Sequence, residues 1–151
     1  MFGFFKKKFK ISDAAESAVG LLSIQIMLMN PDNKKSSKRL TEMYSRGYIF
    51  GFCDVIMKGA NLNQASKNYK TQTLEFAEML DLVHRRIFGE KKGEKILLQS
   101  FEDQEKSIFC KGANRGIQDF AYYCESNGKP IWGLYGYLHE GKKYFELDGE
   151  T

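Results

Sequence analysis

A single acidic residue stands inside the most apolar stretch of the chain, and it is the first candidate for chemistry. Residues 48–57 hold Asp54 among aliphatic and aromatic side chains. A carboxylate in such surroundings needs an ion-pair or hydrogen-bond partner, or a place at the rim of a pocket. Lys58 lies one helical turn further on, and Arg115, followed by Asp119 four residues later, is a second candidate partner. We therefore predict a polar cluster of Asp54, Arg115 and Asp119.

Two glycine pairs, each spaced by four residues, accompany these charges. Gly47 and Gly51 form the first pair, Gly112 and Gly116 form the second, and Arg115 directly precedes Gly116. Residues four apart share one face of a helix, where each glycine costs roughly 1 kcal/mol relative to alanine. Close packing against another backbone would offset this cost, so we predict that both pairs are helix-crossing sites. The alternative is an anion site at a helix start near Arg115, although the phosphate-loop and dinucleotide fingerprints are absent.

Nucleophiles and metal-ligand residues are few and widely spaced. The histidines are His84, on an apolar helical face, and His139, and the cysteines are Cys53, Cys110 and Cys124. Zinc sites and disulfide scaffolds need closer spacings, and a dimetal carboxylate centre would need Glu-x-x-His. We predict no metal, cofactor or catalytic residue, which favours a non-enzymatic protein. A small enzyme or ligand-binding protein with a pocket near Asp54 and Arg115 stays an alternative, because an active site assembled from distant residues leaves no local motif.

The first ten residues combine aromatic and basic side chains. The candidates for membrane contact are Phe2, Phe4, Phe5, Lys6, Lys7 and Lys8. Aromatic rings favour the headgroup region and lysines attract anionic lipid, at about 1 kcal/mol per basic residue near the surface. A peripheral membrane-surface adaptor is therefore an alternative function. The competing interpretation is a tail whose phenylalanines dock on the fold.

Two further segments are candidates for binding a partner protein. They are the C-terminal aromatic segment and a basic cluster, which together contain Trp132, Tyr135, Tyr137, Tyr144, Lys34, Lys35, Lys38 and Arg39. Tyrosine, tryptophan and arginine are enriched at interface hot spots. The same aromatic residues could instead cover the open end of a small helical bundle.

The net positive charge of the chain comes from its first ten residues. The chain has 23 Lys and Arg against 19 Asp and Glu. Four of the lysines lie in residues 1–10, so the remainder has 23 − 4 = 19 basic residues and is neutral. A neutral body argues against nucleic-acid binding. The 151 residues, 42% of them hydrophobic, suffice for one domain with a core. We expect a cytoplasmic location, with membrane association through residues 1–10 as the alternative.

Apolar periodicity predicts four helices before residue 125. The first covers about 14–29 with Ser12 or Asp13 as its cap, and the second runs from a cap at Ser36 or Ser37 to about Lys58. The third covers about 71–88. The fourth starts near Glu94 and either continues to Tyr123 or Cys124 or breaks and restarts near Gly112. The second helix is apolar almost all round in its later half, which indicates a central, buried position.

The closely spaced glycines and alternating aromatics of residues 129–147 favour a small β-hairpin, with a short helix from Pro130 as the rival. We therefore predict a basic aromatic tail (1–10), one mainly helical domain (11–147) and a polar tail (148–151). The domain is a compact bundle of four to five helices around the buried second helix. By elimination, the predicted function is a protein-binding module of bacterial type, such as an immunity protein or an antitoxin, which neutralises a partner by docking.

Overall fold

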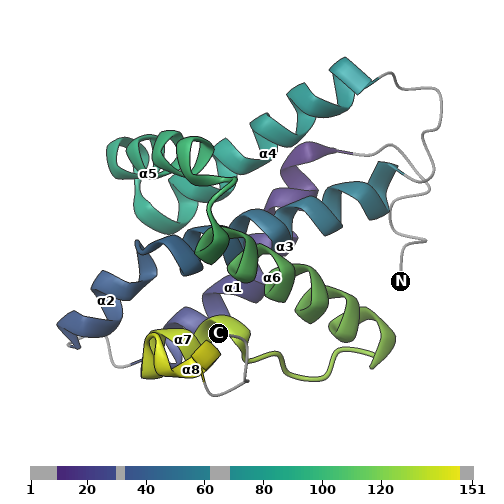
Figure 1. The fold of residues 1–151 in the computed structure, drawn as a ribbon. Coiled ribbons are helices and arrows are strands. Elements are labelled where there is room, and N and C mark those ends of the chain that lie inside the picture. Colours follow the sequence, from purple (N-terminus) through teal and green to yellow (C-terminus); the bar gives the residue numbers. More distant parts are fainter. Residues whose placement is uncertain (1–9, 30–32, 62–68, 147–151) are drawn as a thin grey trace.

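The computed structural model describes residues 10–29, 33–61 and 69–146 of the chain. The regular elements in these ranges are helices (Figure 1). In chain order they are α1 (Ile11–Met27), α2 (Lys34–Leu40), α3 (Met43–Asn61), α4 (Tyr69–Phe88), α5 (Glu90–Asp103), α6 (Ser107–Glu125), α7 (Gly133–Glu140) and α8 (Lys143–Glu146). The prediction of a mainly helical bundle is confirmed, with more and shorter helices than the four or five expected.

The apolar helix expected at the centre of the fold is α3. The side chains of Tyr48, Ile49, Phe52, Cys53 and Ile56 are almost fully buried. They are covered because α3 contacts α1, α2, α4, α5, α6 and α7. In Figure 1, α3 lies between α4 and α5 on one side and α6, α7 and α8 on the other. A helix that is apolar around most of its circumference is in this way removed from water.

The helix expected from Ser36 or Ser37 to about Lys58 starts earlier and is interrupted. Its first part, α2, is capped by Asn33, whose side chain accepts hydrogen bonds from two backbone N–H groups at 3.1 and 3.4 Å. The Ser36 hydroxyl donates instead to the carbonyl oxygen of Leu138 on α7, at 3.0 Å. The serines therefore do not cap the helix, because an asparagine three residues earlier already binds its first amides.

The interruption between α2 and α3 falls at Thr41 and Glu42. The Ser45 hydroxyl donates to the carbonyl oxygen of Arg39 at 2.7 Å, and Arg46 Nε donates to the carbonyl oxygen of Thr41 at 3.0 Å. Carbonyl groups at the end of a helix otherwise lack partners. Two side chains at the start of α3 thus replace hydrogen bonds that the break removes.

Two other helix starts differ from the prediction. Ser12 and Asp13, expected as caps of the first helix, lie inside the first turn of α1. The fourth helix begins at Glu90 rather than Glu94, directly after Gly89, whose φ of 91° favours glycine. The region that follows contains two helices, α5 and α6, which answers the question that periodicity left open.

The C-terminal β-hairpin predicted for residues 129–147 is wrong, because the described part of this segment forms α7 and α8. Leu134, Tyr137 and Leu138 are buried, and their spacing of three and four residues places them on one helical face. Gly141, with a φ of 70°, ends α7. The rival interpretation of a short helix is the one that the structure supports.

Candidate functional site

The two glycine pairs lie where α3 and α6 cross. A Cβ atom added to Gly47 or Gly51 would lie closer than 3.0 Å to the backbone of α6, and one added to Gly112 or Gly116 would lie equally close to the backbone of α3. Only glycine permits this contact, and the added dispersion contact offsets its cost in a helix. Because the second pair is inside α6 and not at its start, it does not form the amide anion site considered as an alternative.

One carboxylate collects hydrogen bonds from three helices beside this crossing. Asp119 Oδ2 accepts from the Tyr48 hydroxyl of α3 at 2.5 Å and from the backbone N–H of Gly133 at 2.9 Å. Asp119 Oδ1 accepts from Arg115 Nε at 2.8 Å. The predicted pairing of Arg115 with Asp119 thus exists, and it is joined to the first turn of α7.

Gln25 of α1 completes this network. Its Oε1 accepts from the backbone N–H groups of Leu134 and Tyr135, at 2.9 and 3.0 Å, and its Nε2 donates to the Tyr48 hydroxyl at 3.0 Å. Gln25 and Asp119 together bind three consecutive N–H groups at the start of α7, the groups that a helix leaves unpaired. The sequence signal for Gln25 was a lone amide within an apolar run, and sequence reasoning missed it.

Asp54 does not belong to this cluster, and that part of the prediction is wrong. It pairs with Lys58, one turn later on α3, with 2.8 Å between Lys58 Nζ and Asp54 Oδ2. Asp54 and Tyr48 are six residues apart, which turns their side chains about 120° away from each other around the helix. The face of α3 that reaches Asp119 is therefore not the face that carries Asp54.

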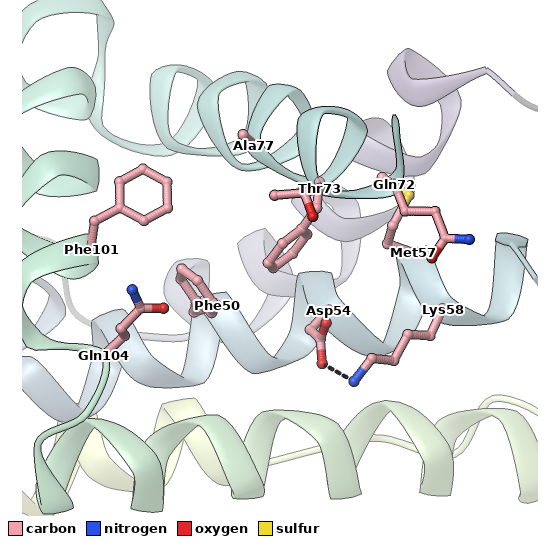
Figure 2. Close-up of a pocket in the computed structure, with 10 residues that line it drawn as sticks. Phe50, Asp54, Met57, Lys58, Gln72, Thr73, Ala77, Phe101 and Gln104 are labelled. Carbon is pink, nitrogen blue, oxygen red and sulfur yellow. Dashed lines mark ion pairs between the residues drawn. The ribbon is translucent and has the colours of Figure 1, made fainter. Parts of the chain in front are cut away.

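Asp54 instead lines an open groove of about 560 Å³ along α3 (Figure 2). In Figure 2, Thr73 and Ala77 of α4 lie along one edge, and Phe101 and Gln104 lie at one end. The lining residues are Phe50, Asp54, Met57, Lys58, Gln72, Thr73, Phe76, Ala77, Phe101 and Gln104. Arg115 does not line this groove, which therefore does not join Asp54 to Arg115.

The groove has an apolar floor and a neutral ion pair. The ring of Phe50 packs edge-on against those of Phe76 and Phe101, with centroids 5.2 and 6.1 Å apart. Asp54 and Lys58 form an ion pair with each other, which the dashed line in Figure 2 marks. The groove can therefore seat an apolar group beside this ion pair and the polar side chains of Gln72, Thr73 and Gln104.

The predicted partner-binding residues differ in burial and in the contacts that they make. Tyr137 is buried and stacks on Tyr44, with ring centroids 4.5 Å apart. Tyr144 lies under Gly136, where a Cβ atom would meet its ring. Arg39 Nη1 donates to the carbonyl oxygens of the last turn of α7, at 3.1 and 2.7 Å. These three residues hold the C-terminal helices in place, and their role as partner contacts stays a prediction.

The exposed Trp132 and the half-buried Tyr135 lie at the start of α7. Trp132 and Tyr135 pack edge to face, and the Tyr135 ring stacks on His139. Tyr135 and His139 also line a hollow with Leu28, so the start of α7 adjoins the last turns of α1. We call this surface the α1–α7 face and define it by the side chains of Ile24, Met27, Leu28, Trp132 and Tyr135. Asn33 and Ser36 at the start of α2 line the same hollow, so α2, which carries Lys34, Lys35 and Lys38, adjoins the face.

The remaining titratable and nucleophilic residues are dispersed. Cys53 is buried, which raises the pKa of its thiol, whereas Cys110 is exposed. His84 is buried and its Nδ1 lies 2.7 Å from the carbonyl oxygen of Leu80. Within the described ranges, no group of three His, Cys, Asp or Glu side chains is placed to hold a metal ion.

The candidates for membrane contact, Phe2, Phe4, Phe5, Lys6, Lys7 and Lys8, lie outside the described residues. Among the residues that are described, none of the helices has the length and apolar character needed to cross a bilayer.

Comparison of the chain with protein-family models, with curated protein sequences and with solved structures gives no match. The proposal of a function therefore has to rest on the surfaces described above.

Proposed function

We propose that the protein is a non-enzymatic binding module that docks on a partner protein through the α1–α7 face. The supporting observation is the gathering of large apolar side chains that remain exposed there: Ile24 is 58% exposed, Met27 79%, Leu28 54% and Trp132 49%. Contiguous exposed apolar side chains mark interaction sites, because covering them removes apolar area from water. Immunity proteins and antitoxins act in this manner, by covering a partner without catalysis, and we propose this functional class.

The arrangement beneath the face supports the proposal. Gln25 and Asp119 bind the first three N–H groups of α7, and Arg39 binds the carbonyl oxygens at its other end. Trp132 and Tyr135 are therefore carried by a short helix that is fixed at both ends. A surface that is already ordered loses less conformational freedom on binding, which favours affinity.

The test is affinity capture from native cells with full-length protein, followed by a binding measurement with the purified partner. Leu28→Asp on the α1–α7 face is compared with Leu74→Asp on α4, a leucine of similar exposure that is not part of the face. We expect the Leu28 variant to lose the partner while the Leu74 variant retains it. A charge in the centre of an apolar contact costs several kcal/mol when it is left unpaired, so the expected loss is about a hundredfold or more in Kd.

Both leucines are exposed, so neither change should alter the melting temperature appreciably. Equal retention of the partner by both variants would overturn the docking surface. Loss of the partner only in the Leu74 variant would place the interface on α4 instead of the α1–α7 face.

A second candidate function is ligand binding in the groove along α3. The observation in its favour is a volume of about 560 Å³ over the rings of Phe50, Phe76 and Phe101, which is in the usual range for small-molecule sites. We expect Phe76→Ala to abolish any ligand binding that the wild type shows in a thermal-shift screen of amphipathic compounds. A hit that binds the variant equally well would place that ligand elsewhere.

A further inference from the structure

We infer that the segment of the partner that covers the α1–α7 face is an acidic amphipathic helix. This inference rests on the proposed function and names the chemistry of the partner. It is carried by two features next to the exposed apolar side chains, namely the charge of α2 and the two hollows beside the end of α1.

The first feature is the uniform charge of α2. Residues 33–41 contain four basic residues and no acid. Lys34, Lys35 and Lys38 are exposed, whereas Arg39 is engaged with the carbonyl oxygens of α7. Three exposed ammonium groups thus belong to a helix that adjoins the apolar face. Carboxylates on the partner are the complementary charge, and complementary charges raise the rate and the specificity of docking.

A further basic residue, Lys92 in the first turn of α5, lies near the end of α1. Lys92 of α5 lines a hollow of about 560 Å³ together with Met27, Met29, Leu40 and Phe88. This hollow lies between the ends of α1, α2 and α4. An apolar side chain inserted here would be within reach of another ammonium group.

A second, smaller hollow of about 260 Å³ lies on the other side of Met29, and it is lined by Leu28, Met29, Asn33, Ser36, Tyr135 and His139. Two hollows that share Met29 suit side chains that project from one face of a helix at spacings of three, four or seven residues. The flexible methionines Met27 and Met29 can adapt to the side chains that enter.

A nucleic acid fits these features less well than an acidic helix. Most contacts to a nucleic acid run from basic and polar groups to phosphate and sugar, whereas the exposed side chains at the end of α1 include the apolar Met27 and Leu28. The body of the chain outside residues 1–10 is also neutral. An oligonucleotide is therefore included in the experiment as the competing occupant.

The experiment uses Trp132, which is the only tryptophan of the chain and lies in the face itself. Full-length protein is titrated with a designed tryptophan-free helical peptide of about five turns that has leucines along one face and glutamates on the other. The matched peptides carry lysine in place of glutamate, or the same composition in an order without an apolar face. A single-stranded oligonucleotide is titrated in parallel.

We expect only the acidic amphipathic peptide to give a saturable blue shift of the Trp132 emission. Lys34→Glu together with Lys38→Glu should weaken its binding by about tenfold or more, since two attractive charges become repulsive. Lys10→Glu together with Lys70→Glu is the matched control, because these exposed lysines lie at the starts of α1 and α4, away from the face. Circular dichroism of each variant establishes that the helices are retained.

Equal or tighter binding of the lysine peptide, of the reordered peptide or of the oligonucleotide would overturn the inference. So would unchanged binding of the acidic peptide by the variant with Lys34→Glu and Lys38→Glu. If the acidic peptide fails while the natural partner is still lost in Leu28→Asp, the proposed function stands and only the partner chemistry is wrong. If Leu28→Asp retains the natural partner, the docking surface itself is wrong.

Discussion

At the scale of single residues, Asp119 has the most consequential position. Its two carboxylate oxygens accept hydrogen bonds from Tyr48 of α3, Arg115 of α6 and the first N–H of α7. Arg115 is on the same helix as Asp119, whereas Tyr48 and Gly133 bring α3 and the start of α7 to the same carboxylate. The side chain of Asp119 is buried, so the Tyr48 hydroxyl and the Gly133 N–H, which are also buried, would lose this acceptor without access to water if the carboxylate were removed.

We expect Asp119→Ala to destabilise the fold by about 2–4 kcal/mol, because it leaves a buried hydroxyl and a partly buried guanidinium without their acceptor. Asp81→Ala is the matched control. Asp81 also pairs with an arginine four residues away, but that ion pair is well exposed and should contribute less than about 1 kcal/mol. Urea denaturation of the two variants checks the difference. An equal decrease in the free energy of unfolding in the two variants would show that the Asp119 network stabilises the fold no more than an exposed ion pair does.

A second residue-scale feature is a buried histidine next to a buried charge. Burial lowers the pKa of His84, and the charge of Arg46 lowers it further, while the Leu80 carbonyl and Asp81 act in the opposite direction. The Nδ1 atom donates to the Leu80 carbonyl oxygen, so Nε2 is the unprotonated nitrogen, and it has no hydrogen-bond partner in the described structure. Protonation would place a second cation in the interior.

The lowered pKa of His84 sets the sign of a pH dependence. Above about pH 6.5 the imidazole is neutral in both the folded and the unfolded chain. Below that pH the unfolded chain binds the proton more readily, so the free energy of unfolding should decrease as the pH falls. We expect His84→Gln to reduce the loss measured by urea denaturation between pH 7.5 and 5, and His139→Gln, at an exposed position, to leave it unchanged. A loss unaffected by His84→Gln would show that other groups cause it.

At the scale of elements, the crossing of α3 and α6 depends on direct backbone contact. A Cβ atom on Gly51 would lie within 3.0 Å of the backbone at Ala113 of α6. The obstacle is a helix backbone, which cannot move aside in the way that a flexible side chain can. The crossing also brings Tyr48 to Asp119, so a shift of one helix would disturb the hydrogen bonds that hold α7.

Gly51→Ala should therefore destabilise the protein by roughly 1–3 kcal/mol through overpacking, and Gly51→Leu by at least as much. Gly20→Ala, in the exposed middle of α1, is a control with the opposite expected sign. Nothing lies within 4 Å of a Cβ atom at Gly20, so alanine there should stabilise the helix by about 0.5–1 kcal/mol. Thermal melts should show a lower melting temperature for Gly51→Ala and a higher one for Gly20→Ala. An unchanged melting temperature in Gly51→Ala would show that the Gly51 face of α3 is exposed to solvent.

The breaks between helices are decided at this scale as well. α5 ends at Asp103, which forms ion pairs with Lys106 and with Arg46 of α3, each at 2.8 Å. Arg46 also donates to the carbonyl oxygen of Thr41 at the end of α2. One guanidinium of α3 thus holds two helix ends, the end of α2 and the end of α5. The periodicity of either helix contains no sign of this arrangement.

At the scale of the whole molecule, the small C-terminal helices are tied to the rest of the fold. α7 receives hydrogen bonds or side-chain caps from α1, α2 and α6. Leu134 and Leu138 of α7 belong to the same apolar core as Tyr48 and Phe52 of α3. Contacts of this kind couple the order of α7 to the order of the bundle.

We therefore expect the described helices to unfold in one cooperative transition. The emission of Trp132 reports on the start of α7, and far-ultraviolet circular dichroism reports on all helices together. The two signals should give the same midpoint in urea, as in a two-state transition. A Trp132 transition at a clearly lower urea concentration would contradict the coupling and would identify α7 and α8 as a separately unfolding unit.

The sequence by itself determined the features that depend on neighbours within a few residues. Apolar periodicity located α1, α3 and α4 and identified α3 as the central helix. The spacing of Gly47 with Gly51, and of Gly112 with Gly116, marked faces where another backbone could approach. These features are local, because residues three and four apart share one face of a helix whatever surrounds it.

Only the tertiary structure decided which side chains meet. Gln25 binds amides of α7 that are 109 and 110 residues away, and it thereby supports the start of a helix where glycines and aromatics suggested a hairpin. Asp54 turned to Lys58, because the helical twist of α3 points it away from Asp119. The α1–α7 face likewise joins the end of α1 to the start of α7. Hydrogen bonds and surfaces between distant segments depend on how the helices pack, and a pattern within one helix contains no information about its neighbours.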